Sequence, residues 1–226
     1  MKGVFGMPSP SSANPPARPR KLRVTVLCGG PSAEREISLA SGQAVAEALR
    51  RNGHDVFVAD IGPDQLAALD QPADVVFPAL HGPFGEDGTV QRLLAERDLP
   101  FVGSDARASA LAMDKAATKE AVIAAGIPTP AYEVWDAVTL RTRPAPRLSW
   151  PVIVKPVDQG SSVATNIVRE AAGFPPAVRL AVDQFGRALV EQFIAGEEIT
   201  VGILGDQALP PICIRPKRQF YDFEAK

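Results

Sequence analysis

Apolar and polar residues along the first half of the chain form a repeating pattern typical of strands followed by helices. Short, β-branched apolar runs indicate buried strands, and apolar residues at helical spacing between them indicate amphipathic helices. The predicted strands cover residues 22–28, 54–60, 74–80 and 101–103. The predicted helices cover residues 32–53, 63–70 and 89–98. This alternation predicts an open parallel sheet with helices on both faces, in which ligands bind at the carboxyl ends of the strands.

The pattern changes in the second half. A helix is predicted over residues 114–126, and the arginine- and proline-rich residues 137–149 are expected to form a surface loop. Four short apolar runs then follow, interrupted by one helix near residues 175–186: PVIVKPV, SVATNIV, ALVEQFI and EITVGILG. Short strands separated by turns indicate an antiparallel sheet, so we expect a second domain.

These patterns divide the chain into three parts. We expect a disordered tail over residues 1–20, an N-terminal domain over 21–113 and a second domain over 114–226. The tail is rich in proline, serine and basic residues and lacks the apolar core of about 7–15 residues found in a signal peptide. The last segment, ALPPICIRPKRQFYDFEAK, shows no helix or strand that would close the second sheet. We therefore expect the chain to be a fragment of a longer protein.

Composition and charge exclude several classes of protein. With 46% apolar and 22% charged residues, the chain is not disordered throughout, a coiled coil or a collagen. The net charge of −2 provides no basic field, so we expect no nucleic-acid partner. Apolar runs are far shorter than the roughly 20 residues that span a bilayer, so we expect no membrane partner. Cys28 and Cys213 both lie in apolar runs and are expected to be buried free thiols.

Two loops leave the carboxyl ends of predicted strands, GGPSAERE and HGPFGEDG. The first carries Glu34, and the second carries His81 and Glu86. An acidic residue in the first turn of a helix is also favoured by the helix dipole, which explains Glu36 well and Glu34 only partly. A single histidine is more often structural. The position of His81 at a strand end nevertheless favours function.

The second half has its own candidate chemistry. Lys155 projects from the predicted strand in VIVKP, and QGSSV follows as a loop between two strands. Backbone N–H groups and hydroxyls in such a loop can cover phosphate oxygens. A strand lysine can also be a solvated edge residue, and the loop can be a simple turn, so these local signals are ambiguous by themselves.

Six strings occur in a fixed order along residues 22–226: LCGGPSAEREISLASG, PALHGPFGEDGTVQRLL, PFVGSDARASALAMDK, PVIVKPVDQGSSV, LVEQFIAGEEITVGIL and FYDFEAK. Together they resemble the D-alanine–D-alanine ligase family of the ATP-grasp superfamily. The resemblance implies an α/β fold, with a doubly wound, parallel, Rossmann-like preATP-grasp domain followed by an incomplete α+β ATP-grasp domain.

The resemblance also implies an activity. Members use ATP and two divalent cations, Mg²⁺ or Mn²⁺, to phosphorylate the carboxylate of one D-alanine. The amine of the second D-alanine attacks the acyl phosphate, and the dipeptide enters peptidoglycan synthesis. Members are usually homodimers. The absence of a signal peptide and the need for ATP predict a cytoplasmic location. The cations are held by residues expected beyond this chain, so we expect no metal ligand within it and no activity from these 226 residues alone.

Site residues follow from the resemblance by position. Glu34, His81 and Glu86 are expected at the D-alanine substrates, and Ser161 is expected to contact Glu34. The catalytic set is then Glu34, Ser161 and His81. The expected ATP-binding residues are Lys115, Lys155, Ser161, Ser162, Glu191, Phe193, Ile194, Glu198 and Lys226. Among these, the lysines are expected to bind the phosphates. Glu191 is expected to meet the amino edge of adenine, and Glu198 is expected to bind the ribose. Phe193 and Ile194 pack on adenine or in an ordinary core.

Some alternatives remain open. The family usually has glycine where this chain has Ala164, which is expected to stiffen the strand after the loop. A D-alanine–D-lactate ligase would share these motifs, and a truncated protein could bind nucleotide or D-alanine without catalysis. A dinucleotide-binding module is disfavoured because GGPSAERE lacks the G-x-G-x-x-G spacing.

Overall fold

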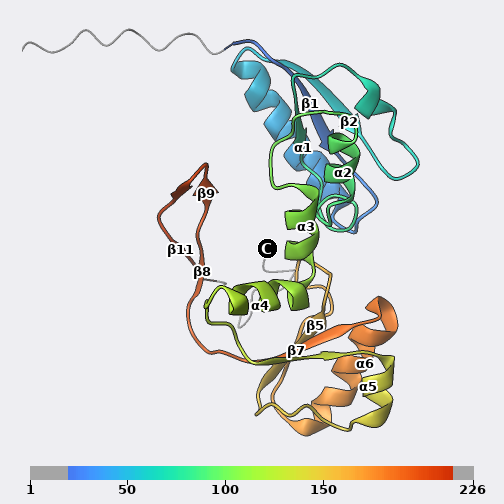
Figure 1. The fold of residues 1–226 in the computed structure, drawn as a ribbon, viewed down its shortest axis with the longest axis vertical. Coiled ribbons are helices and arrows are strands. Elements are labelled where there is room, and N and C mark those ends of the chain that lie inside the picture. The colour runs from blue at the N-terminus through green and yellow to red at the C-terminus, as the bar shows by residue number, and fades with distance from the viewer. Residues whose placement is uncertain (1–19, 216–226) are drawn as a thin grey trace, which may run out of the picture.

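The structure is a computed structural model that describes residues 20–215. A parallel sheet lies in the N-terminal half and an antiparallel sheet in the second half, with α3 (Ala106–Met113) and α4 (Lys115–Ala124) between them along the chain (Figure 1). The expected tail and Lys226 lie outside the described residues, apart from Arg20. Among residues 20–215, no helix is both long and apolar enough to cross a membrane.

The first sheet has the strand order β2-β1-β3. Its strands are β1 (Arg23–Cys28), β2 (Asp55–Asp60) and β3 (Val75–Pro78), all parallel. The predicted open parallel sheet is confirmed. The predicted fourth strand is wrong, because that segment contributes only one isolated bridge, between Val76 and Phe101. A bridge of this kind adds one edge contact without extending the sheet.

Helices cover both faces of this sheet, as predicted. Side chains alternate along β1, so Val24 and Val26 face α1 (Arg35–Arg51), whereas Leu27 packs on the other face with α2 (Thr89–Ala95). The predicted helix over 63–70 is shorter than expected. It is the 3-10 helix η1 (Ala67–Asp70), because the residues before it form a tight turn.

Two helices lead into the second half. The carboxylate of Asp105 caps α3 (Ala106–Met113), and that of Asp114 caps α4 (Lys115–Ala124). The second helix was predicted, but the first was missed. None of the residues of α3 is buried, so it carries no apolar stripe to signal it.

The second sheet is antiparallel, as predicted, with the order β4-β7-β5-β6. The strands are β4 (Tyr132–Trp135), β5 (Val152–Pro156), β6 (Asn166–Val168) and β7 (Ala188–Gln192). The first of them had not been predicted.

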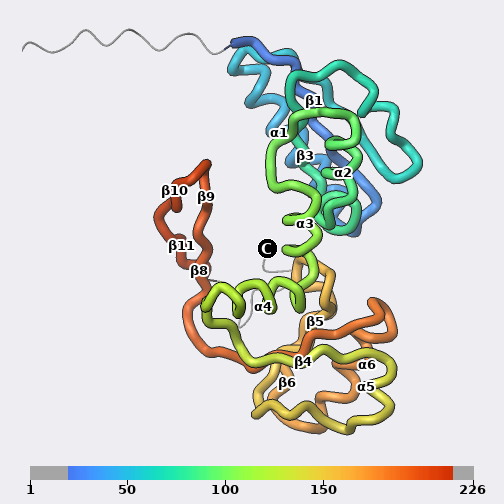
Figure 2. The backbone as a smooth tube through the Cα atoms, viewed as in Figure 1, coloured from blue at the N-terminus to red at the C-terminus, as the bar shows by residue number. Residues whose placement is uncertain are grey.

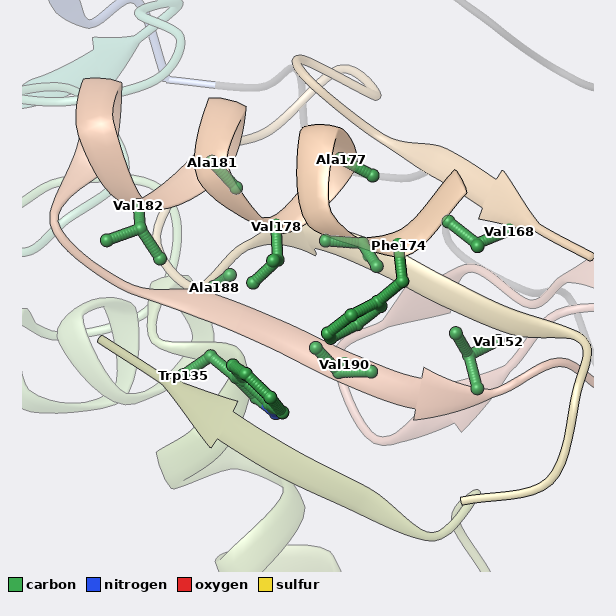
Figure 3. Close-up of a cluster of buried hydrophobic side chains, with 11 residues drawn as sticks. Trp135, Val152, Val168, Phe174, Ala177, Val178, Ala181, Val182, Ala188 and Val190 are labelled. Atoms are coloured by element: carbon green, nitrogen blue, oxygen red, sulfur yellow. The ribbon is translucent and has the colours of Figure 1, made fainter. Parts of the chain in front are cut away.

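Two helices pack against this sheet, α5 (Ala137–Thr142) and α6 (Phe174–Phe185). The expectation of a loop over 137–149 is wrong for its first six residues, because the carboxylate of Asp136 accepts the N–H of Thr139 at 2.7 Å and starts a helix. Figure 3 shows the core between helix and sheet, where the Trp135 and Phe174 rings meet edge to face with centroids 4.9 Å apart.

The chain then forms two short antiparallel pairs. Strand β8 (Glu198–Thr200) pairs with β11 (Ile212–Ile214), and β9 (Ile203–Leu204) pairs with β10 (Gln207–Ala208). This extension reaches away from the two sheets (Figure 2). The last segment therefore contains the short strand β11, but this strand pairs with β8 and does not join the second sheet.

Both cysteines are free thiols, as expected. Cys28 is buried, and burial raises the pKa of its thiol. Cys213 is exposed, which corrects the expectation that it is buried, because it lies on the extension rather than in a core.

Candidate functional site

The two halves of the chain meet at Glu34 and Ser161. Glu34 lies in the turn after β1, directly before α1, and Ser161 lies in the loop between β5 and β6. The Ser161 hydroxyl donates a hydrogen bond to the Glu34 carboxylate across 127 positions of sequence. The structure thus brings together the two residues whose contact the resemblance implied.

The turn that carries Glu34 is held by a network of its own. Gly29 and Gly30 adopt φ values of 77° and 80°, a left-handed conformation that favours glycine. The Arg35 guanidinium pairs with Asp60 at the end of β2 and donates to the Gly30 carbonyl at 3.2 Å. The hydrogen bond from Arg35 lowers the pKa of the Asp60 carboxyl. The charged pair therefore ties the glycine turn to the neighbouring strand.

Gly29→Ala is expected to destabilise the protein more than Gly53→Ala. Both glycines are left-handed, which costs an alanine about 1–2 kcal/mol. A Cβ on Gly29 would lie 2.1 Å from Asp60 Oδ1, whereas Gly53 has nothing within 4 Å. Displacing the carboxylate adds about 1–3 kcal/mol at Gly29. Urea unfolding of the two variants measures the difference, and equal free energies of unfolding would contradict the role given to this turn.

The second predicted loop passes beside the same carboxylate. A Cβ built on Gly82 would lie 3.9 Å from Glu34 Oε2, so the backbone approaches Glu34 closely there. The Gly82 N–H donates to Glu86 Oε2 at 2.7 Å, and Glu86 Oε1 lies 3.8 Å from His81 Nδ1. His81 Nε2 is buried and has no hydrogen-bond partner among the described residues. The two loops that follow β1 and β3 therefore converge on one place.

A group of lysines surrounds Glu191 on β7. Lys155 of β5 pairs with one carboxylate oxygen, and Lys119 of α4 approaches the other, with Nζ 3.0 Å from Oε2. Burial opposes the charged form of Glu191, but the two ammonium groups outweigh it and hold the pKa of the carboxyl below its ordinary value. Lys119 had not been predicted. Its place four residues after Lys115, on the same face of a helix, was the available signal.

Lys115 holds the start of the loop that carries Ser161. Its ammonium donates to the carbonyls of Gln159 at 2.5 Å and Val157 at 3.3 Å. Burial, and then the nearby ammonium of Lys155, lower the pKa of Lys115. Both lysines line an open cavity of about 350 Å³, whose other lining residues include Gln159, Gly160, Ser161 and Ser162. Cationic side chains beside a loop rich in backbone N–H groups suit phosphate oxygens.

This loop has an unusual backbone. Ser161, Ser162 and Ala164 have φ values of 49°, 59° and 48°. Left-handed conformations are uncommon for residues other than glycine, and such strain is concentrated at ligand-binding sites. Ala164 is the position at which the resembling family usually has glycine, and its left-handed conformation gives the physical reason for glycine there.

Other predicted nucleotide-binding residues lie apart from this cavity. Ile194 is 64% exposed, and Glu198 is exposed on β8. Phe193 is partly buried, and its N–H donates to the Pro151 carbonyl at 3.1 Å. Neither Phe193 nor Ile194 belongs to a buried apolar cluster of the described residues, so the alternative of ordinary core packing is not supported.

Two family models match the sequence. The model described as D-ala D-ala ligase N-terminus matches residues 62–104, and the one described as D-ala D-ala ligase C-terminus matches residues 122–226. The D-alanine--D-alanine ligase of Gloeobacter violaceus is 49% identical over 210 residues, which are 91% of this chain and 70% of that protein. That of Granulibacter bethesdensis is 44% identical over 208 residues, which are 90% of this chain and 67% of that protein.

Solved structures agree with the sequence matches. The D-alanine-D-alanine ligase of Coxiella burnetii has a TM-score of 0.71 at 30% identity, covering 84% of this chain and 68% of that one. The ligase of Bacillus anthracis has a TM-score of 0.72 at 29% identity, covering 91% of this chain and 68% of that one. The chain thus spans about two thirds of the length of these relatives. It belongs to the D-alanine–D-alanine ligase family.

Proposed function

We propose that the protein joins two D-alanines to D-alanyl-D-alanine through an acyl phosphate formed with ATP, a step that supplies peptidoglycan synthesis. The observation that carries this proposal is the contact between Ser161 and Glu34, next to a cavity lined by Lys115 and Lys155. It places a carboxylate suited to an amino group beside cations suited to phosphates. Residues 21–113 would then supply the D-alanine side of the site, and residues 114–226 the nucleotide side.

The chemistry requires this pairing of charges. A carboxylate resists nucleophilic attack because of its negative charge, and phosphorylation removes that obstacle. Phosphoryl transfer is accelerated by fixed positive charge near the oxygens on which negative charge develops. Lys115 and Lys155 supply such charge, and the loop over 159–163 can cover the phosphate oxygens. Glu34 would accept hydrogen bonds from the ammonium of the first D-alanine while Ser161 keeps its carboxylate oriented.

The divalent cations implied by the family are not matched by ligands in the described part of the chain. Among residues 20–215, no three histidine, cysteine, aspartate or glutamate side chains lie together in a way that could hold a metal ion. Magnesium prefers oxygen ligands such as carboxylates. The described residues therefore do not supply the ligand set of a magnesium site by themselves.

A coupled assay tests the proposed activity. The native protein, given ATP, magnesium and D-alanine, is expected to release phosphate and to form the dipeptide, detected by mass spectrometry. Turnover with D-lactate but not D-alanine as second substrate would favour the D-alanine–D-lactate ligase instead. Saturable binding without turnover would favour a non-catalytic binding protein. The 226-residue chain, assayed in parallel, tests the expectation that it is inactive alone.

Lys155→Met is expected to weaken nucleotide binding about 10- to 100-fold, because it removes a charge-assisted hydrogen bond to phosphate. Lys21→Met removes the same charge at an exposed position outside the site and is expected to leave binding unchanged. Titration calorimetry with ADP measures both variants. Equal affinities of Lys155→Met and the wild type would contradict the assignment of Lys155 to the phosphates.

We further propose that the protein is cytoplasmic and, as the resemblance implies, a homodimer. Cytoplasmic location supplies the ATP that the reaction consumes. The native mass in solution, measured by light scattering and compared with the intact mass of the denatured chain, tests the dimer. A native mass equal to that of one chain would contradict it.

A further inference from the structure

The carboxylate of Glu191 is shared between two lysines that differ in their surroundings. The Lys155 side chain is 23% exposed and lines the cavity, whereas the Lys119 side chain is 8% exposed and does not line it. Lys119 is also fixed by other partners, because its ammonium donates to the Thr129 hydroxyl at 2.7 Å and the Pro130 carbonyl at 2.9 Å. Lys155 can therefore turn toward a ligand, and Lys119 cannot.

The charged and titratable groups around Glu191 come from three elements. Lys155 reaches it from β5, Lys119 and the more distant Lys115 from α4, and Tyr132 lies opposite it on β4. The ammonium of Lys119 also lies over the Tyr132 ring, with Nζ 5.1 Å from the ring centroid. Glu191 is thus the carboxylate shared by Lys155 and Lys119, and of these two cations Lys119 is the one that does not line the cavity.

Binding of a phosphate group near Lys155 changes which cations are paired with Glu191. If Lys155 moves from Glu191 to a phosphate, one carboxylate oxygen loses its ionic partner. A buried carboxylate without a cation is strongly destabilised, and it takes up a proton instead. The adenine amino group proposed to meet Glu191 is neutral and cannot replace the lost charge. Only a cation that stays in place keeps the carboxylate ionised.

We propose that Lys119 is a positioning residue that serves as the permanent counterion of Glu191. It allows Lys155 to exchange between that carboxylate and the phosphates of the nucleotide. This inference rests on the proposed function, since it requires a nucleotide whose phosphates attract Lys155. Lys119 does not touch the nucleotide; it acts through Glu191 and thereby frees Lys155.

Proton uptake on nucleotide binding tests the proposal. ADP is titrated into the native protein and into Lys119→Met by calorimetry, in buffers of different ionisation enthalpy, from pH 6.5 to 8.5. In the variant, Glu191 has no cation once Lys155 leaves, so binding is expected to take up about one proton more than in the wild type. Its affinity relative to the wild type is then expected to fall about tenfold for each unit of rising pH. Protons exchanged by ADP itself are the same in both experiments, so they cancel when the variant is compared with the wild type.

Two further variants serve as controls. Thr129→Val removes a hydrogen bond from Lys119 but keeps its charge, so the wild-type proton count is expected. The double variant Lys119→Met with Glu191→Gln removes the carboxylate as well and is expected to lose the extra proton uptake. ADP binding by Lys119→Met without extra protons would overturn the inference alone. A wild type that does not bind ADP would overturn the proposed function and the inference with it.

A measurement on the unmodified protein covers the case in which Lys119→Met does not fold. The ¹³C signal of the Glu191 side-chain carboxyl, followed by NMR at neutral pH, is expected to remain that of an ionised carboxylate after ADP is added. A shift to the protonated form in the wild-type complex would overturn the proposal, since Lys119 would then be unable to keep Glu191 charged.

Discussion

Glu34→Gln is expected to lower kcat/KM for D-alanine by about 30-fold or more while leaving the KM for ATP nearly unchanged. Removing one partner of a hydrogen-bonded charge pair costs about 2–5 kcal/mol, which corresponds to such a loss. Glutamine keeps the size of the side chain and one oxygen that can accept from Ser161. The loss therefore reports the missing negative charge rather than a changed shape.

Several contacts support the proposal that Glu34 meets the D-alanine substrate rather than the nucleotide. It follows the glycine turn after β1, the Gly82 loop approaches it from β3, and Ser161, which donates to it, also lines the cavity with the two lysines. A carboxylate at the meeting point of two strand ends, beside cations, suits the ammonium group of an amino acid. ATP would meet the lysines instead, so its KM should change little.

Glu36→Gln provides the matched control. Glu36 lies two residues further on, in the first turn of α1, and is exposed. The same loss of one charge there is expected to change kcat/KM for D-alanine by less than about twofold, since surface charges contribute little. Steady-state kinetics are measured with D-alanine varied at saturating ATP, and then with ATP varied at saturating D-alanine. The two series give the effect of each variant on each substrate separately. A similar loss in both variants would contradict a specific role for Glu34.

The periodicity of apolar residues predicted those elements that bury a face. Strand β1 alternates between two cores, and α6 buries five of its twelve residues, so both carry a clear pattern. Helix α3 buries none, and the segment around Phe101 makes only a single bridge. Elements that bury little apolar surface lack a periodic signal, and their ends are set by caps such as Asp105.

The same distinction applies to the candidate site, where residues in local sequence strings could be predicted and residues joined only by tertiary packing could not. Glu34 and Ser161 were identified because both lie in local strings that resemble a family, and the structure brings them together. The pair of Lys119 and Glu191 was not identified, because its members are far apart in sequence and neither lies in a pattern that points to the other. Such a pair is created by the packing of α4 against β7, which only the tertiary structure shows.

Trp135→Ala is expected to lower the free energy of unfolding of the second sheet by about 3–5 kcal/mol, the usual cost of emptying a buried aromatic site. The Trp135 side chain is fully buried between β4 and α6 (Figure 3). Its ring meets Phe174 edge to face, the Arg143 guanidinium lies 4.8 Å from its centroid, and its Nε1 donates to Glu133 at 3.0 Å. All of these contacts are lost together.

Val138→Ala is the control for this substitution. Val138 lies on α5, three residues further on, and is 58% exposed, so its truncation is expected to cost less than about 0.5 kcal/mol. Urea unfolding followed by circular dichroism compares the two variants, and Trp150, which also packs on Phe174, remains as a fluorescent reporter of the same core. Equal urea midpoints for the two variants would contradict this packing of Trp135.

Because β4 pairs with β7 opposite Glu191, loss of this core is also expected to abolish ADP binding at urea concentrations that the wild type tolerates.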